Sequence, residues 1–199
     1  MSKNRQIHDH YEHRITNDRE NYDILNWASS ASQLARFEVF AASVPIEGRT
    51  VLDVGSGLGD LYEFLKAIEI NVEYTGVDII EKMTAAAKDR HPSGHFICCD
   101  IFDDNSDFPG GYDVVFCSGM FNLNLGNNQA FLKSALLRMM ELTTDYLVFN
   151  MLHKRACDEP DRYYYTTPDE SLSILKPHAK ELRVLDDYLP NDFTIICRK

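Results

Sequence analysis

Residues 50–61, with the sequence TVLDVGSGLGDL, constrain the fold more than any other stretch of the chain. Residues 50–54 have the length and the β-branched content of a buried strand. Gly55, Gly57 and Gly59 follow on alternate positions, where the strand must turn sharply into a helix that begins near Asp60. The free N–H groups of such a helix start can bind the polar or anionic atoms of a ligand. This stretch predicts an α/β domain with a nucleotide-type site; the alternative is an ordinary strand-to-helix turn.

The spacing of the glycines separates the nucleotide classes. A dinucleotide fingerprint reads G-x-G-x-x-G, whereas the third glycine arrives one residue early here, and Asp53 precedes the first glycine by two residues. The segment VLDVGSGLG resembles the first motif of the class I S-adenosylmethionine-dependent methyltransferases, D/E-x-G-x-G-x-G after an apolar strand. The resemblance implies a Rossmann-like three-layer α/β/α fold, with S-adenosylmethionine as cofactor and S-adenosylhomocysteine as product.

Composition and charge narrow the class of protein. The 199 residues, 44% apolar and 26% charged, suit one globular domain. A net charge of −11 disfavours nucleic acid as the main partner, because such binding rests on neutralising phosphates. The polar residues 1–14 lack the apolar core of a secretory signal, and no apolar run is long enough to cross a bilayer. The five cysteines form no zinc spacing, so we expect buried, reduced thiols and a cytoplasmic protein.

Hydrophobic periodicity predicts a seven-stranded, mostly parallel sheet whose last strand is antiparallel. Residues 29–199 are expected to form the core of a single domain, and residues 1–28 an N-terminal arm that either caps the ligand site or packs against the domain. His8, His10 and His13 in that arm lack a cysteine or carboxylate partner, so no metal site is predicted. The expected strands are 50–54, 71–78, 95–99, 111–117, 146–152, 181–187 and 192–198, and the expected helices are 29–44, 60–70, 79–90, 128–142 and 168–176.

Two more acidic residues stand at the carboxyl ends of predicted strands: Asp78 is the last residue of 71–78, and Asp100 directly follows 95–99. Asp78 lies 23 residues beyond Gly55, where an acid can bind a ribose diol; capping the next helix is a compatible alternative. In the resembling family, the position of Asp100 meets the adenine amino group and that of Ile101 packs on the ring; a loop aspartate beside a core isoleucine is the alternative. The resemblance assigns Asp53 and the three glycines to the methionine part. The expected cofactor-binding residues are Asp53, Gly55, Ser56, Gly57, Gly59, Asp78, Ile79, Asp100, Ile101 and Cys117.

The sequence indicates less about the residues that would bind the methyl acceptor. Residues 117–124 follow the fourth strand and should face both the transferred methyl group and the substrate. Asn122 in this loop can orient an amine or hydroxyl, and His153 ends the fifth strand, where a general base would stand. In the triplet 163–165, side chains alternate along the chain, so at least one tyrosine should be exposed or line the pocket. Asn122, His153 and Tyr164 are the candidate catalytic residues.

These features predict methyl transfer to a small-molecule acceptor by in-line displacement. Residues 118–121 lack the N/D-P-P-Y/F pattern of enzymes that methylate nucleic-acid amino groups, which makes a nucleic-acid base an unlikely acceptor. Two alternatives stay open. One is a non-catalytic module on the same fold that binds the cofactor or a protein partner. The other is an NAD-dependent oxidoreductase, which the glycine spacing disfavours.

Overall fold

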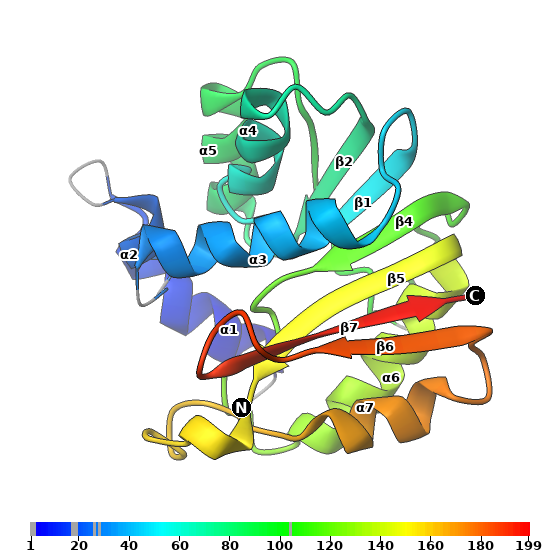
Figure 1. Cartoon of the computed structure of the whole chain (residues 1–199). Helices are drawn as coiled ribbons and strands as arrows, with labels where there is room; N and C mark the ends of the chain where they lie inside the picture. Colours follow the sequence, from blue (N-terminus) through cyan, green and yellow to red (C-terminus); the bar gives the residue numbers. More distant parts are fainter. Residues whose placement is uncertain (1–2, 17–19, 26, 28, 104) are drawn as a thin grey trace.

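A mixed seven-stranded sheet forms the centre of the molecule (Figure 1). The computed structural model describes residues 3–16, 20–25, 27, 29–103 and 105–199. The strand order is β3-β2-β1-β4-β5-β7-β6, and β7 runs antiparallel to the other six strands. The predicted fold class is therefore confirmed. The strands are β1 (Thr50–Val54), β2 (Glu73–Asp78), β3 (His95–Cys98), β4 (Tyr112–Cys117), β5 (Thr143–Leu152), β6 (Glu181–Leu185) and β7 (Asp192–Arg198).

Helices cover both faces of the sheet. One face packs against α3 (Ser30–Ser43), α4 (Asp60–Ala67) and α5 (Glu81–Arg90). The other face packs against α6 (Asn128–Leu142) and α7 (Pro168–Leu175). The remaining helices, α1 (Lys3–Tyr11), η1 (Glu12–Arg14) and α2 (Asn21–Ile24), lie beside the carboxyl ends of the parallel strands, as the blue segments of Figure 1 show, and η2 (Lys154–Ala156) follows β5.

The central strand β4 shows how the two cores are divided. Val114 and Phe116 face the layer of α3–α5, whereas Val115 and Cys117 face α6 and α7. All four side chains are buried, because a parallel strand in the middle of a three-layer fold is covered on both faces. Phe40 of α3 stacks on Phe116 with 4.2 Å between the ring centroids. The core therefore holds α3 directly above the strands that carry the candidate site.

Two apolar side chains are more exposed than hydrophobic periodicity predicts. Leu34 of α3 and Ile68, which directly follows α4, fall on the predicted apolar faces, yet each is 43% exposed. On α3, the polar Gln33 and Arg36 are buried instead. Arg36 donates from Nε to the buried Asp192 of β7 at 2.6 Å, and this ion pair accounts for the burial of the Arg36 side chain. The helix α4 ends at Ala67, three residues earlier than predicted.

The exposure of the cysteines differs from what the sequence predicts. All five cysteines are free, but only Cys117 and Cys197 are buried; Cys98 and Cys157 are exposed, so the expectation of five buried thiols was wrong. Cys98 lies on the edge strand β3, which pairs only with β2.

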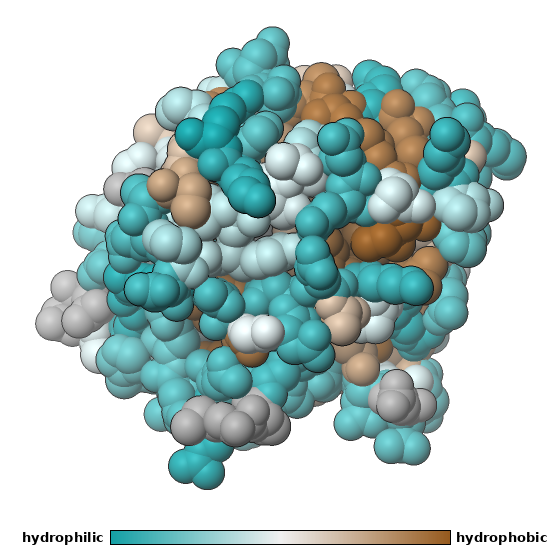
Figure 2. Space-filling view, turned by 90° about the horizontal axis from the view of Figure 1, so that it is seen from below, coloured by the Kyte–Doolittle hydropathy of each residue, from teal (hydrophilic) through white to brown (hydrophobic). Residues whose placement is uncertain are grey.

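Within the described part of the chain, no helix has the length and apolar character to span a membrane. Seen from below, the surface is mostly hydrophilic, with apolar atoms gathered in the right half of the view (Figure 2).

Candidate active site

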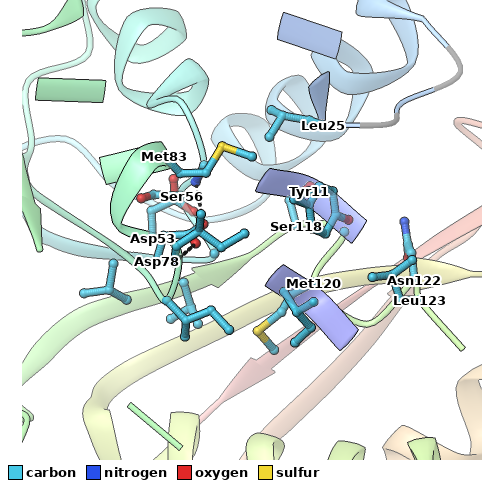
Figure 3. Close-up of a pocket in the computed structure, with 18 of the residues that line it drawn as sticks. Tyr11, Leu25, Asp53, Ser56, Asp78, Met83, Ser118, Met120, Asn122 and Leu123 are labelled. Carbon is cyan, nitrogen blue, oxygen red and sulfur yellow. Dashed lines mark hydrogen bonds between the residues drawn. The ribbon is translucent and has the colours of Figure 1, made fainter. Parts of the chain in front are cut away.

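A pocket opens at the carboxyl ends of the parallel strands, where β1 and β4 lie side by side. The order of the strands along the chain reverses between these two, and ligands of open α/β sheets bind at such a switch point. Figure 3 shows side chains from several elements converging on this space. Its described walls are the glycine loop after β1, the ends of β2 and β3, the loop after β4, and parts of α1, α3 and the N-terminal arm.

The glycine loop is held tightly against β2. The N–H groups of Gly55 and Ser56 donate to the carbonyl of Val77 at 2.8 and 3.0 Å. Gly57 has a φ of +53°, and a Cβ there would lie 2.8 Å from a methyl group of Leu25, so only glycine fits without displacing that side chain. The Ser56 hydroxyl oxygen is buried and has no hydrogen-bond partner among the described residues. The loop therefore presents bare backbone and one free hydroxyl beside the pocket.

Asp78 joins the glycine loop to the start of α5. Its Oδ2 accepts the N–H of Gly57 at 3.0 Å, and its Oδ1 accepts the N–H of Ile80 at 2.9 Å. The helix α5 begins at Glu81 with Ile80 as its N-cap, so the expected capping of a helix at residue 79 is replaced by a turn around Asp78 itself. Burial raises the pKa of the carboxyl group, and the two backbone donors oppose this shift.

Asp53, at the end of β1, is a buried acid on the pocket wall. It accepts a hydrogen bond from the Tyr74 hydroxyl at 2.7 Å. Burial raises the pKa of Asp53 to about 7; the bond from Tyr74 lowers it, while the nearby carboxylates of Asp78 and Asp60 add to the rise. Asp60 also lines the pocket, and it accepts a hydrogen bond from Gln33 of α3 at 2.8 Å. The buried carboxylates make this part of the pocket electronegative, which favours a ligand that carries positive charge.

The segment after β3 supplies a second acid and an apolar surface. Asp100 accepts the side-chain amide of Asn4 from α1 at 2.8 Å and the N–H of Phe102 at 2.9 Å. Ile101 is 2% exposed, belongs to the core and also lines the pocket. Arg138 of α6 donates from Nε to the Ile101 carbonyl at 3.2 Å. The described residues between β3 and β4 form no helix, and this arginine helps to fix the connection.

The loop after β4 forms the opposite wall. Asn150 of β5 accepts the N–H of Gly119 at 3.1 Å and donates to the Ser118 hydroxyl at 2.9 Å. Asn122 donates its N–H to the Gly119 carbonyl at 3.1 Å, and its carbonyl accepts the N–H of Tyr164 at 2.8 Å. The backbone of this loop is therefore fixed from two sides.

The N-terminal arm covers the pocket. Ile7 and Tyr11 of α1 line it together with Leu25 and Trp27. Figure 3 shows Tyr11 and Leu25 beside the pocket. A Cβ on Gly119 would lie 2.4 Å from the Trp27 ring, which shows how closely the indole approaches the loop after β4. The described residues of the arm pack against the domain and contribute to the pocket wall, and the capping of a bound ligand by this arm stays a prediction.

The structure places most, but not all, of the predicted cofactor-binding residues on the pocket wall. Of the expected cofactor-binding residues, eight line the pocket, whereas Cys117 lies buried in β4 and Gly59 serves as the N-cap of α4. Burial raises the pKa of the Cys117 thiol. The eight are Asp53, Gly55, Ser56, Gly57, Asp78, Ile79, Asp100 and Ile101.

Only one of the three catalytic candidates lines the pocket. Asn122 does, whereas the His153 ring accepts the N–H of Arg155 at 3.1 Å and the Tyr164 hydroxyl donates to Glu170 at 3.0 Å, away from the described pocket wall. Tyr163 lines the pocket in place of its neighbour, as the alternation of side chains allows. The described residues form no cluster of three or more potential metal ligands.

Several wall residues were not predicted as site residues. Tyr11 and Trp27 were visible only as apolar residues of a polar arm, and nothing in their spacing pointed to the pocket. Gln33 and Asp60 belong to different helices, and the contact between them appears only once α3 and α4 are packed together.

The chain was compared with protein-family profiles and with other proteins by sequence, and both comparisons found similar proteins. The sequence profile described as "Methyltransferase domain" matches residues 51–141. Over 164 residues the chain is 30% identical to "Putative methyltransferase Rv1506c" of Mycobacterium tuberculosis, an alignment that covers 75% of this chain and 93% of that protein.

Solved structures share the fold over nearly the whole chain. Magnesium protoporphyrin IX methyltransferase (ChlM) from Synechocystis PCC 6803, crystallised with bound S-adenosylmethionine, has a TM-score of 0.69 at 14% identity, covering 100% of this chain and 98% of that one. A S-adenosylmethionine-dependent methyltransferase from Archaeoglobus fulgidus has a TM-score of 0.66 at 18% identity, with coverage of 89% and 97%. At these identities the likeness establishes a common fold.

Proposed function

The chain belongs to the methyltransferase family, and from this premise we propose that its pocket binds S-adenosylmethionine and that it transfers the sulfonium methyl group to a small-molecule acceptor. One observation carries the proposal: the Asp78 carboxylate lines the pocket while two backbone N–H groups hold both of its oxygens in place. Each oxygen keeps a further lone pair, and two hydroxyls of one ribose can donate to them.

The other walls suit the remaining parts of this cofactor. The side chain of Asp100 can accept the adenine amino group, and Ile101 offers an apolar surface to the ring. The glycine loop with Ser56 faces the methionine part, whose ammonium group and sulfonium are favoured by the buried carboxylates of Asp53 and Asp60. In this proposal Gly59 and Cys117 do not contact the cofactor and instead lie behind the residues that line the pocket.

The proposed reaction is an in-line displacement. A lone pair of the acceptor forms a bond to the methyl carbon while the carbon–sulfur bond breaks, and its electron pair stays on sulfur to give S-adenosylhomocysteine. Rate enhancement in such a step comes largely from positioning the two reactants and from excluding water. The arm suits the second task, because Tyr11, Leu25 and Trp27 close the pocket on the side away from the sheet.

A calorimetric titration with S-adenosylhomocysteine tests this proposal. We expect the wild-type protein to bind with a Kd on the order of micromolar. Asp78→Ala should weaken binding by about 10- to 100-fold, because hydrogen bonds to a charged group contribute roughly 1.5–3 kcal/mol each. Asp89→Ala, which removes an exposed carboxylate from the same region of the chain, is the matched control and should bind as the wild type does. Absence of binding by the wild type would overturn the proposal.

The non-catalytic alternative requires a separate measurement. A module that only binds the cofactor would pass the titration and yet form no S-adenosylhomocysteine from S-adenosylmethionine with any acceptor. Product formation, followed by chromatography over a panel of small molecules, therefore decides between an enzyme and a binding module.

A further inference from the structure

We propose that the methyl acceptor is a neutral amine that donates an N–H to the side-chain carbonyl of Asn122. This inference rests on the proposed function and specifies its substrate class. It begins from an unsatisfied group: the Oδ1 atom of Asn122 is buried and has no hydrogen-bond partner among the described residues. An unpaired buried acceptor costs roughly 1–3 kcal/mol, so a bound molecule that supplies a donor gains the bond the folded chain leaves unmade.

The backbone around Asn122 holds this acceptor in a fixed place. Its N–H donates to the Gly119 carbonyl at 3.1 Å, and its carbonyl accepts from the N–H of Tyr164 at 2.8 Å. The side chain lines the pocket, and its Oδ1 makes no hydrogen bond with the described residues. Because the amide is positioned by the main chain, it is available to a ligand at little cost in reorganisation.

The position of Asn122 is that of an acceptor subsite. In Figure 3, Asn122 and Leu123 lie at the opposite end of the labelled group from Asp53 and Asp78, and Met120 lies between the two ends. The proposed cofactor occupies the end near β1 and β2, where the acids stand. A molecule that contacts Asn122 therefore lies on the other side of the pocket from the proposed cofactor, where a methyl acceptor would stand.

The chemistry of this end favours nitrogen over oxygen. No histidine lines the described pocket, and its four carboxylates, Asp53, Asp60, Asp78 and Asp100, are those that the proposed function gives to the cofactor, so none is left to take a proton from the acceptor. Burial raises the pKa of Tyr11, so its phenol stays neutral. An alcohol must lose its proton as it attacks, which calls for a general base, whereas a neutral amine attacks with its own lone pair.

The step balances without a base on the enzyme. The nitrogen lone pair forms the N–CH3 bond, the carbon–sulfur bond breaks, and the sulfur keeps the electron pair. Positive charge moves from sulfur to nitrogen, and the product ammonium releases its proton to water after it leaves. Because the N–H bound by Asn122 becomes charged during the step, this hydrogen bond strengthens in the transition state and lowers the barrier.

Matched pairs of small probes test the inference. S-adenosylhomocysteine formation is measured with S-adenosylmethionine and either benzylamine or benzyl alcohol, and again with either aniline or phenol. We expect each amine to react faster than its hydroxyl counterpart. Asn122→Leu, which keeps the size of the side chain and removes its acceptor, should lower kcat/KM for the amines by about tenfold or more, mainly through kcat. Its affinity for S-adenosylhomocysteine should stay unchanged.

Asn124→Leu is the control from the same loop. The Asn124 side chain is already paired, since it donates to the Pro160 carbonyl at 2.9 Å and accepts from the Gly126 N–H at 3.0 Å. We expect this variant to lower the Tm while keeping the amine preference of the wild type, whereas Asn122→Leu should keep the Tm.

Three results would overturn the inference: hydroxyl probes that react as fast as the amines, no amine turnover by a protein that binds S-adenosylhomocysteine, or an Asn122→Leu variant with wild-type rates. Failure to bind S-adenosylhomocysteine would instead overturn the proposed function.

Discussion

Asp53 shows how burial sets the ionisation of a single residue at this site. The carboxyl group stands at the end of β1 and accepts a hydrogen bond from the Tyr74 hydroxyl. Burial raises its pKa to about 7, against roughly 4 for an aspartate in an unfolded chain. Between these two values the folded protein holds a proton that the unfolded chain has released, so this group makes the free energy of unfolding fall as the pH rises from about 4 to about 7.

Asp53→Asn should remove this pH dependence. The asparagine cannot ionise, and its carbonyl can still accept the hydrogen bond from Tyr74. We expect the Tm of the variant, relative to that of the wild type, to rise from pH 4 to pH 7 and to level off above that, as measured by thermal unfolding at each pH. A Tm difference that stays constant over this range would contradict the prediction.

Asp113→Asn provides a control of opposite sign. Asp113 accepts hydrogen bonds from the N–H and the hydroxyl of Thr50, and these lower its pKa. Its contribution to stability is present at neutral pH and disappears as the pH falls through the lowered pKa. This variant should therefore lose stability at pH 7 and approach the wild type in acid.

At the scale of elements, the N-terminal arm and the loop after β4 depend on each other. Trp27 is the only tryptophan of the chain, it lines the pocket, and its ring stacks on the guanidinium of Arg36 at 4.5 Å. Arg36 is paired in turn with Asp192 at the start of β7. The indole is therefore held between the loop that carries Gly119 and an ion pair buried in the domain.

Gly119→Ala should displace the indole and leave the sheet intact. A Cβ at this position would collide with the rigid Trp27 ring at 2.4 Å, in addition to the strain of a residue with φ near +75°. Tryptophan fluorescence should shift to longer wavelength, and quenching by acrylamide should increase. Gly126→Ala is the matched control, because its φ is +78° and nothing lies within 4 Å of the added Cβ. It should share the cost of the strain and keep the wild-type emission; an equal shift in both variants would contradict the role given to Trp27.

At the scale of the whole molecule, the cofactor should stabilise the domain as one unit. A ligand present at 100 times its Kd adds about 2.7 kcal/mol to the free energy of unfolding. For a protein of this size, each kcal/mol raises the Tm by roughly 2–4 °C. S-adenosylhomocysteine should therefore raise the Tm by roughly 5–10 °C in a thermal-shift measurement, while NAD should leave it unchanged. A comparable shift with NAD would favour the oxidoreductase.

The sequence alone determined the family and most of the topology. VLDVGSGLG is a local pattern, because a buried strand, a turn that needs positive φ and a helix start are specified by neighbouring residues. The family that it indicates, the S-adenosylmethionine-dependent methyltransferases, is confirmed by the sequence relatives. The positions of Asp78 and Asp100 after their strands were predictable for the same reason, since parallel strands bring their carboxyl ends to one edge of the sheet.

The tertiary structure decided which side chains complete the pocket. Tyr11 and Trp27 reach it from an arm that no local pattern connects to the sheet. The Oδ1 of Asn122 is left without a partner among the described residues only by the way the loop folds, and the His153 ring accepts the N–H of Arg155 away from the described pocket wall. Hydrophobic period assigns a face to each helix taken alone. The burial of Arg36 on α3, by contrast, depends on its bond to a residue 156 positions away, and contacts at such separation exist only in the folded chain.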